Sequence, residues 1–272
     1  MRIILVSVLF IVAVGSVITS LSLLSRATFL QITSVKVTGT HLVPEISVET
    51  TVENSLAGTW WKIFSKDSIF LYPRHTLEQS IVKDFPPIAD VSFSHNGFHT
   101  LTVAVTERSP FALACNKSDS EGDATPACFY MDSTGFVYAP APQFSPGVYV
   151  TYTTASTIST STAIGTFITN PTDFVIARQA ISYISGLGLT VVGIDVPAAD
   201  STSNNGDFQL SIQRPIGTAT ATSSPVITVY FNSSQPLDTT LEYFRAFWQN
   251  ETNKNFQYID LRYGKDIVFK MQ

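Results

Sequence analysis

The sequence predicts an α+β protein with three parts: an apolar N-terminal helix, a small β-α-α-β-β module, and a larger domain whose antiparallel sheet carries helices on one face. Three observations predict it. A long uncharged segment opens the chain, alternating strand patterns and two helix patterns follow, and strand patterns dominate the second half. We therefore divide the chain into an anchor at residues 1–26, a module at 31–108 and a β domain at 109–272.

The first part is the apolar run IILVSVLFIVAVGSVITSLSLL, residues 3–24, which is long enough to cross about 30 Å of hydrocarbon as a helix. A cleaved signal peptide with its cleavage site at residues 20–22 is the alternative, but the apolar core of a signal peptide spans only about 7–15 residues. Arg2 precedes the run and Arg26 and Lys36 follow it, so positive charge does not decide the orientation. We expect an uncleaved single-pass anchor in the cytoplasmic membrane with the folded parts outside. The reason is that only two residues precede the apolar run, so they contain little that would keep the rest of the chain in the cytoplasm. A longer natural N-terminus is an open alternative.

The second part, residues 31–108, is predicted to fold as β-α-α-β-β. Ile32–Gly39 alternates apolar and polar residues as a strand does, and Pro44 and Gly58 suit the start and the end of a first helix. A second helix is expected at Thr76–Phe85, with Thr76 as its N-cap. Trp60 and Trp61 would either lie near the membrane surface or, as is more common, cover a helix. Two strands flank the turn signal Asn96-Gly97, at residues 88–94 and 100–107.

The third part carries strand patterns interrupted by two helix patterns, expected at residues 170–188 and 236–250. A Ser/Thr-rich stretch at residues 151–162 contains little charge and is expected to form a surface loop or an irregular edge. A C-terminal hairpin closes the domain. The other strands are expected at residues 111–115, 128–132, 136–139, 147–154, 189–196, 208–213 and 226–231.

Composition and cysteine content limit the classes of binding partner and site that this protein can have. Charged residues make up 14 % of the chain and the net charge is −5, so there is no basic surface of the kind that binds nucleic acid. Cys115 and Cys128 flank a polar loop between two apolar runs, and pairing of those runs would let them form a disulfide in an oxidising compartment. Two free thiols are the alternative. No second Cys or His pair lies at ligand spacing, so we expect neither a metal nor a cofactor.

The C-terminal segment FQYIDLRYGKDIVFK, residues 256–270, is predicted to be a hairpin that turns tightly at Gly264-Lys265. Its last strand would lie at a sheet edge, where unpaired backbone groups can receive a strand from another chain. Asp260 and Arg262 lie two residues apart, which favours a lateral, half-exposed ion pair.

Side chains of this hairpin would give a partner its specificity. Ile267 and Phe269 are expected to point to one face, and Val268 and Lys270 to the other. The alternative is that the apolar residues pack against helix 236–250, with Lys270 as a solvated residue that discourages self-association. The candidate partner-binding residues are Tyr263, Lys265, Ile267, Val268, Phe269 and Lys270.

Four segments, taken in order behind the anchor, resemble the bacterial cell-division family FtsQ, called DivIB in Gram-positive bacteria. Residues 32–39 resemble the first strand of the family's POTRA module. FPPIADVSFS and TLTVAVTERSPFAL resemble its helix end, its last strands and a Glu-Arg-x-Pro junction, here Glu107, Arg108 and Pro110. FYMDSTGFVY resembles the hairpin that opens the family's β domain, and YIDLRY, residues 258–263, is similar to its near-terminal signature.

This resemblance implies a non-enzymatic component of the division machinery, located in the cytoplasmic membrane at the division septum. Members of the family bind two small single-pass proteins, FtsB (DivIC) and FtsL, and the assembly helps to control the septal peptidoglycan synthase. The last strands of the β domain receive FtsB by strand addition, and the POTRA module assists recruitment. The cytoplasmic head that the family usually carries is almost absent here, and the Ser/Thr-rich stretch and the loop between the cysteines are additions.

Two other classes of protein stand beside this expectation. A POTRA module of a translocation or outer-membrane assembly machine would predict tandem modules or a barrel. A membrane-anchored envelope enzyme would predict converging polar residues, and no nucleophile-elbow, zinc-protease or phosphate-loop motif occurs. His41 or His75, Cys128 and Arg262 follow the order found in sortases, but Cys128 follows ATPA instead of the sortase TLxT context. We therefore expect no enzymatic activity.

Overall fold

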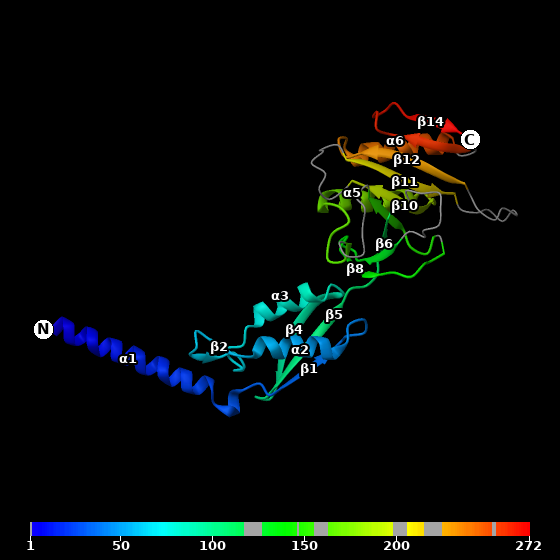
Figure 1. Ribbon diagram of the computed structural model, residues 1–272. Coiled ribbons are helices and arrows are strands. Elements are labelled where there is room, and N and C mark those ends of the chain that lie inside the picture. The colour runs from blue at the N-terminus through cyan, green and yellow to red at the C-terminus, as the bar shows by residue number, and fades with distance from the viewer. Residues whose placement is uncertain are drawn as a thin grey trace. The chain divides into compact units, whose positions relative to one another are not determined.

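The computed structural model describes residues 2–116, 127–145, 147–154, 163–197, 206–214, 225–251 and 254–272. The protein is a mixed α+β chain that forms two compact units, Met1–Arg108 and Ser109–Gln272 (Figure 1). Each unit has its own hydrophobic core.

The first unit opens with helix α1 (Arg2–Ser25). Its segment Ile3–Ser25 is apolar, and except at its last turn it is not buried by other parts of the protein, so α1 is long and apolar enough to cross a membrane. A 3₁₀ turn, η1 (Thr28–Leu30), leads from it into the folded part.

The folded part of the first unit is a three-stranded sheet covered by two helices. Strand β5 lies in the middle, parallel to β1 and antiparallel to β4. Helix α2 packs against β1, helix α3 packs against β4, and the two helices contact each other. The bounds are β1 (Ser34–Thr38), α2 (Glu45–Leu56), α3 (Arg74–Asp84), β4 (Ile88–Asn96) and β5 (Thr100–Glu107).

Two features of this unit differ from the sequence prediction. Helix α3 begins at Arg74, two residues before Thr76, because Pro73 fixes the entry and its carbonyl accepts the N–H of Leu77 at 2.9 Å. Thr76 is therefore not the N-cap. A small hairpin that the pattern did not predict, β2 (Thr59–Trp60) and β3 (Phe64–Ser65), lies between the helices in sequence.

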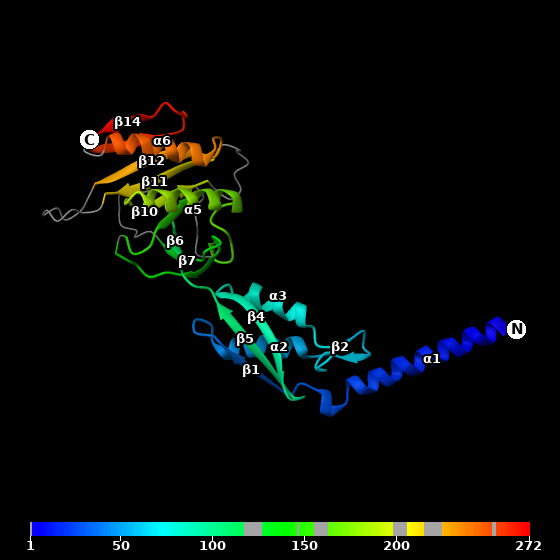
Figure 2. The same cartoon turned by 180° about the vertical axis from the view of Figure 1, so that it is seen from behind.

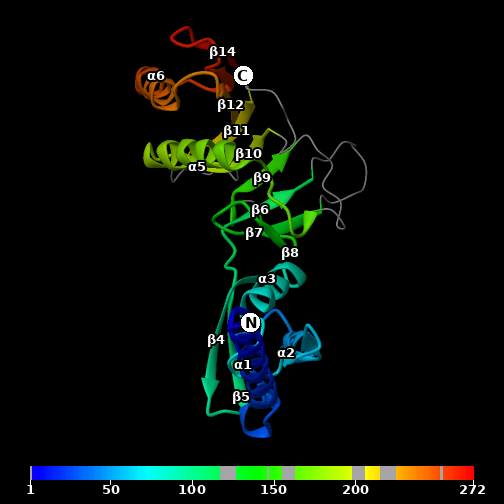
Figure 3. The same cartoon turned by 90° about the vertical axis from the view of Figure 1, so that its left-hand side faces the viewer.

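The second unit contains one nine-stranded sheet, in the order β14-β13-β12-β11-β10-β9-β6-β7-β8. Helices α5 (Pro171–Gly186) and α6 (Leu237–Asn250) lie on one face of it, as predicted (Figure 3). The strands are β6 (Ala112–Cys115), β7 (Cys128–Met131), β8 (Val137–Pro140), β9 (Thr151–Thr154), β10 (Thr190–Val196), β11 (Asp207–Gln213), β12 (Val226–Asn232), β13 (Phe256–Asp260) and β14 (Val268–Met271).

The sheet is mixed, so the prediction of an antiparallel sheet was wrong. Strand β9 is parallel to both β6 and β10, and β12 is parallel to β13. For two of these pairs, β9–β10 and β12–β13, the cause is that α5 and α6 act as crossovers between neighbouring strands, and a helical crossover brings the chain back in the same direction. The strand expected at residues 147–154 is confirmed at Thr151–Thr154, which lies inside the sheet with Tyr152 fully buried. These residues are thus not part of the loop or edge expected at 151–162, whose residues 155–162 lie outside the described residues.

Two consecutive segments of this sheet share one topology. β9–α5–β10–β11 and β12–α6–β13–β14 each consist of a parallel strand pair joined by a helix, followed by an antiparallel strand. Strand β12 of the second segment pairs antiparallel with β11 of the first. The equivalent position beside β14 is the end of the sheet.

Candidate partner-binding edge

The candidate partner-binding edge is the β14 end of the nine-stranded sheet, formed by the C-terminal hairpin of β13 and β14. The two strands pair antiparallel, with Ile259 opposite Phe269 and Asp260 opposite Val268. A seven-residue loop, residues 261–267, joins the strands, so the predicted two-residue turn at Gly264-Lys265 was wrong. Gly264 still has a positive φ of 72°, which glycine adopts without strain.

The loop is wide because residues distant in sequence hold its first half. The N–H of Leu261 donates to the carbonyl of Tyr230 on β12 at 2.8 Å, and the side-chain amide of Gln235 donates to the carbonyl of Arg262 at 3.0 Å. These contacts fix the chain beside β12 for two residues after β13 ends. The turn toward β14 therefore starts later than the sequence indicated.

An ion cluster anchors the same segment. The guanidinium of Arg262 donates two hydrogen bonds to the carboxylate of Asp260, at 2.9 and 2.7 Å, and one to Asp207 on β11 at 3.0 Å. Its Cζ lies 5.3 Å from the ring centroid of Tyr230. The ion pair predicted between Asp260 and Arg262 is confirmed: the Arg262 side chain is 32 % exposed, whereas Asp260 is buried. The contact with Asp207 was not predicted.

Burial and pairing with Arg262 shift the pKa of Asp260 in opposite directions. Desolvation by burial would raise the pKa of its carboxyl group, but the hydrogen bonds and the positive charge of Arg262 outweigh it and lower that pKa. The hydrogen bonds to Asp260 likewise raise the pKa of Arg262. Both groups are charged at neutral pH, and the loop before β14 is tied to β11, β12 and β13 at once.

Strand β14 ends the sheet, and its outer side pairs with no strand among the described residues. The N–H of Gln272 donates inward to the carbonyl of Asn255 at 3.1 Å. Because backbone groups alternate in direction along a strand, those of Phe269 and Met271 point outward. These outward groups are the ones that an added strand would bind.

The side chains of this strand alternate between the two faces of the sheet. The Phe269 ring packs on Phe247 of α6 and Phe256 of β13, with centroids 5.3 and 5.5 Å apart, and Ile267 also packs against the core. Val268 and Lys270 occupy the opposite face, and Val268 is 46 % exposed. One face therefore rests on helix α6, as the alternative interpretation supposed, while the outward backbone groups pair with no strand in the described part of the chain.

The remaining predicted residues lie beside the edge. Tyr263 and Lys265 are exposed in the loop, as is Asp266. Lys270 is exposed on β14. Cationic side chains thus accompany the edge at its loop end and on the strand itself.

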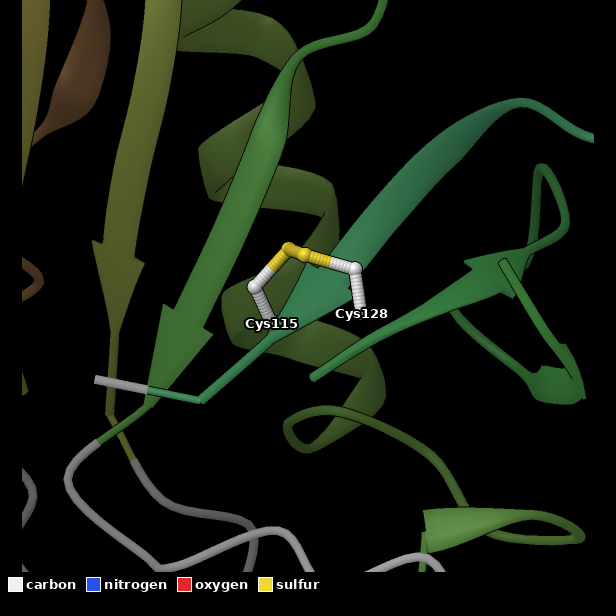
Figure 4. Close-up of a disulfide and its surroundings, with 2 residues drawn as sticks. All are labelled: Cys115 and Cys128. Carbon is white, nitrogen blue, oxygen red and sulfur yellow. A yellow bond between two sulfur atoms is a disulfide. The ribbon is translucent and has the colours of Figure 1, made fainter. Parts of the chain in front are cut away.

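Cys115 and Cys128 lie opposite each other on β6 and β7 and are joined by a disulfide (Figure 4). Strand β7 is six positions from β13 in the sheet, so Cys128 and Arg262 are roughly 29 Å apart at a strand spacing of about 4.8 Å. Cys128 and Arg262 of the sortase-like order therefore do not meet. No group of His, Cys, Asp or Glu suited to a metal ion occurs in the part of the chain that the structure describes.

In the first unit, Glu107 has a role that the motif did not indicate. Its carboxylate accepts hydrogen bonds from the backbone N–H groups of His41, Leu42 and Val43, at 2.8 to 3.0 Å. Burial would raise the pKa of Glu107, but these hydrogen bonds lower it. Glu107 therefore fixes the loop that enters α2, and no partner-binding role is needed to explain it.

No protein-family model matches the chain, and a search of curated proteins finds no significant match.

Proposed function

We propose that this protein is a single-pass scaffold of the FtsQ/DivIB type, which binds small single-pass partners similar to FtsB (DivIC) and FtsL and helps to control septal peptidoglycan synthesis. The observation that carries the proposal is the outer side of β14, where backbone groups of Phe269 and Met271 point away from the sheet. An added strand would satisfy these groups, and the side chains beside them would select its sequence.

The first unit supports the same assignment. Its order β1–α2–α3–β4–β5, with β1 parallel to β5 and antiparallel β4 on the other side, is the arrangement we expect of a POTRA module. Helix α1 precedes it and is suited to anchor the chain in the cytoplasmic membrane. The hairpin β2–β3 is an insertion between the two helices.

Charge indicates which partner segment would fit. Lys265 and Lys270 are exposed next to the edge, and Asp266 is the one acidic side chain in the loop 261–267. An incoming strand with acidic residues flanking an apolar centre would match these cations and the exposed Val268. The lysines also disfavour pairing between two copies of β14, since like charges would approach each other.

Site-specific photo-crosslinking in dividing cells tests the proposal. A photoreactive residue at Val268 or Phe269 should crosslink to a small single-pass protein, whereas the same probe at buried Ile259 should not. Val226 on β12 is a matched control, because it is 44 % exposed on the same sheet but away from its edge. Capture from Val226 as strongly as from Val268, or no capture from β14 while the protein concentrates at midcell, would refute strand addition. Absence from midcell would refute the division role and favour the translocation alternative.

A backbone variant separates strand addition from side-chain contact. Met271→Pro removes one outward N–H, which an edge strand tolerates, while Met271→Ala shortens the side chain and keeps that N–H. We expect Met271→Pro to weaken binding of the captured partner about tenfold, on the order of one hydrogen bond, and Met271→Ala to change it far less. Equal effects of the two variants would contradict a backbone-mediated interaction.

A further inference from the structure

The hairpin β2–β3 lies against the last turn of α1 (Figures 1 and 2). The hydroxyl of Ser22 donates to the carbonyl of Ile63 at 2.7 Å, and the guanidinium of Arg26 donates to the carbonyls of Lys62 and Ile63 at 3.3 and 3.2 Å. The hydroxyl of Ser25 accepts the N–H of Ser65 at 3.3 Å. Four hydrogen bonds therefore fix the hairpin at one height along the helix.

This position along α1 coincides with the surface of a membrane that α1 would span. The 24 residues of α1 extend about 36 Å at a rise of 1.5 Å per residue, and the hydrocarbon layer is about 30 Å thick. When α1 spans this layer, Ser22 and Ser25 lie at its boundary on the side of the folded units. The hairpin bonded to them then lies where lipid headgroups meet the acyl chains.

The hairpin and α1 enclose an apolar cleft of about 620 Å³. It is lined by Leu21 and Leu24 of α1, by Trp60 and Trp61 of the hairpin, and by Phe70 and Leu71 after it. A volume of this size lies within the range of pockets that hold small molecules, about 300–1,000 Å³. Several of these apolar side chains are largely exposed, Trp61 and Phe70 most of all.

The tip of the hairpin is strained and places an aromatic residue outward. Trp61 and Lys62 are the central residues of a turn closed by the N–H of Ile63 and the carbonyl of Trp60 at 2.9 Å, and both have positive φ, 46° and 62°. Bulky residues rarely adopt this conformation, and such strain persists mainly at functional sites. Trp61 is 83 % exposed, so it is not packed over α2 or α3 as a residue that covers a helix would be.

Basic side chains surround the tryptophans. Lys62 follows Trp61 in the turn, Lys66 lies 5.4 Å from the ring centroid of Trp60, and Arg26 is bonded to the hairpin. Tryptophan prefers the headgroup layer of a bilayer, and cations near it attract anionic phosphates. Asp67 is the nearest acidic residue in sequence, and its carboxylate is held by the hydroxyl of Ser65.

We infer that the cleft between α1 and the β2–β3 hairpin is a phospholipid site. An acyl chain of the leaflet facing the folded units occupies the apolar cleft, Trp60 and Trp61 lie in the headgroup layer, and Arg26, Lys62 and Lys66 face the phosphates. The inference rests on α1 spanning the membrane, which is part of the proposed function, but it does not depend on strand addition at β14. Its consequence is that the first unit is held at the bilayer surface by two connected attachments, the helix and the hairpin.

Tryptophan quenching by brominated lipid tests this site in the full chain. The protein is reconstituted in vesicles of phosphatidylcholine and phosphatidylglycerol, with a phosphatidylcholine that carries bromine near the glycerol end or near the methyl end of an acyl chain. The Trp248→Phe variant leaves Trp60 and Trp61 as reporters, and we expect them to lose most of their emission, more with the shallow bromine than with the deep one. Alkaline extraction shows separately whether α1 is inserted, so a failure of the anchor is distinguished from a failure of the lipid site.

Two controls complete the experiment. A Trp60→Phe, Trp61→Phe variant retains only the buried Trp248, whose emission should not respond to brominated lipid. Adding Ile46→Trp to that variant places an exposed tryptophan on α2, at the opposite end of the first unit's sheet, and it too should be insensitive. Equal quenching at Ile46→Trp and at the hairpin, or an inserted protein whose hairpin tryptophans are not quenched, would overturn the inference. Unquenched but blue-shifted emission would identify protein, such as a second copy, as the covering partner and would also overturn it.

Discussion

Removal of the Arg262 side chain should destabilise the second unit and release the loop 261–267 that precedes β14. Arg262 forms two hydrogen bonds with Asp260 and one with Asp207, and Asp260 is buried. Loss of one partner from a buried ion pair costs about 3–5 kcal/mol. The Arg262 side chain is 32 % exposed, so water compensates part of this, and we expect Arg262→Met to lower the free energy of unfolding by about 2–3 kcal/mol.

The native protein and the Arg262→Met variant should also differ in how their stability changes with pH. In the native protein the lowered pKa of Asp260 contributes stability that is present above an ordinary carboxyl pKa of about 3.9 and is lost as the pH falls through the folded-state value. In Arg262→Met the partner is absent while burial persists, so the pKa of Asp260 should rise above its unfolded value. That variant should therefore gain stability as the pH falls toward the raised pKa, opposite to the native protein.

Trp248 is a suitable reporter, because it is buried in the core of the second unit and the other two tryptophans lie in the first. Denaturant unfolding of the full chain in detergent, in a Trp60→Phe, Trp61→Phe background, follows this unit alone. Asp260→Asn combined with Arg262→Met should recover part of the loss, since no unpaired charge remains. An unchanged unfolding midpoint in Arg262→Met, or strictly additive effects in the double variant, would refute the reasoning.

Three further predictions concern other parts of the fold. Reduction of the Cys115–Cys128 disulfide should lower the free energy of unfolding of the second unit by about 3 kcal/mol, because it closes a chain segment with a sequence separation of 13, and the same tryptophan reporter measures it. Glu107→Gln should speed hydrogen exchange of the loop entering α2 at neutral pH, since the neutral amide holds those N–H groups less firmly than the carboxylate does. Gly39→Ala should disrupt the first unit far more than Gly58→Ala. Both glycines have positive φ, but a Cβ at Gly39 would lie 2.2 Å from a backbone carbonyl oxygen of β5, whereas a Cβ at Gly58 would meet no atom within 4 Å. Circular dichroism of the purified variants compares the two effects.

Each of these has an outcome that contradicts it. An unfolding midpoint insensitive to reductant would mean that the disulfide does not restrain the unfolded chain. Unchanged exchange in Glu107→Gln would mean that the loop is held without the charge. Equal disruption by the two glycine variants would show that backbone conformation, and not the close approach to β5, sets the requirement at Gly39.

Local signals in the sequence predicted the elements that depend on few residues. The uncharged run 3–24 became α1, and Asn96-Gly97 joins β4 and β5. Asp132 accepts the N–H groups of Thr134 and Phe136 in the turn between β7 and β8. In each case the determining contacts lie within a few positions, so a pattern of adjacent residues contains them.

Sheet pairing and the loop before β14 were mispredicted because they depend on distant contacts. Strand direction follows from how α5 and α6 return the chain, which alternation along a strand does not encode. The width of the 261–267 loop depends on Asp207, Tyr230 and Gln235, which lie far from it in sequence. The turn at Trp61-Lys62 has no glycine or asparagine, so turn preferences gave no signal for it.

A sheet made of tandem β-α-β-β segments is open-ended, because each segment finishes with a strand that the first strand of another segment is able to join. At the β8 end the sheet is closed, because Val137 of β8 exchanges backbone hydrogen bonds with Gly165 and Thr166 and the strand finishes at Pro140, which has no N–H to offer. At the other end β14 contains no proline, and the charges of Lys265 and Lys270 oppose continuation. Growth of this sheet is thus limited by a terminator at one end and by electrostatic repulsion at the other. Neutralising Lys270 would lower the electrostatic barrier to pairing between the β14 strands of two molecules.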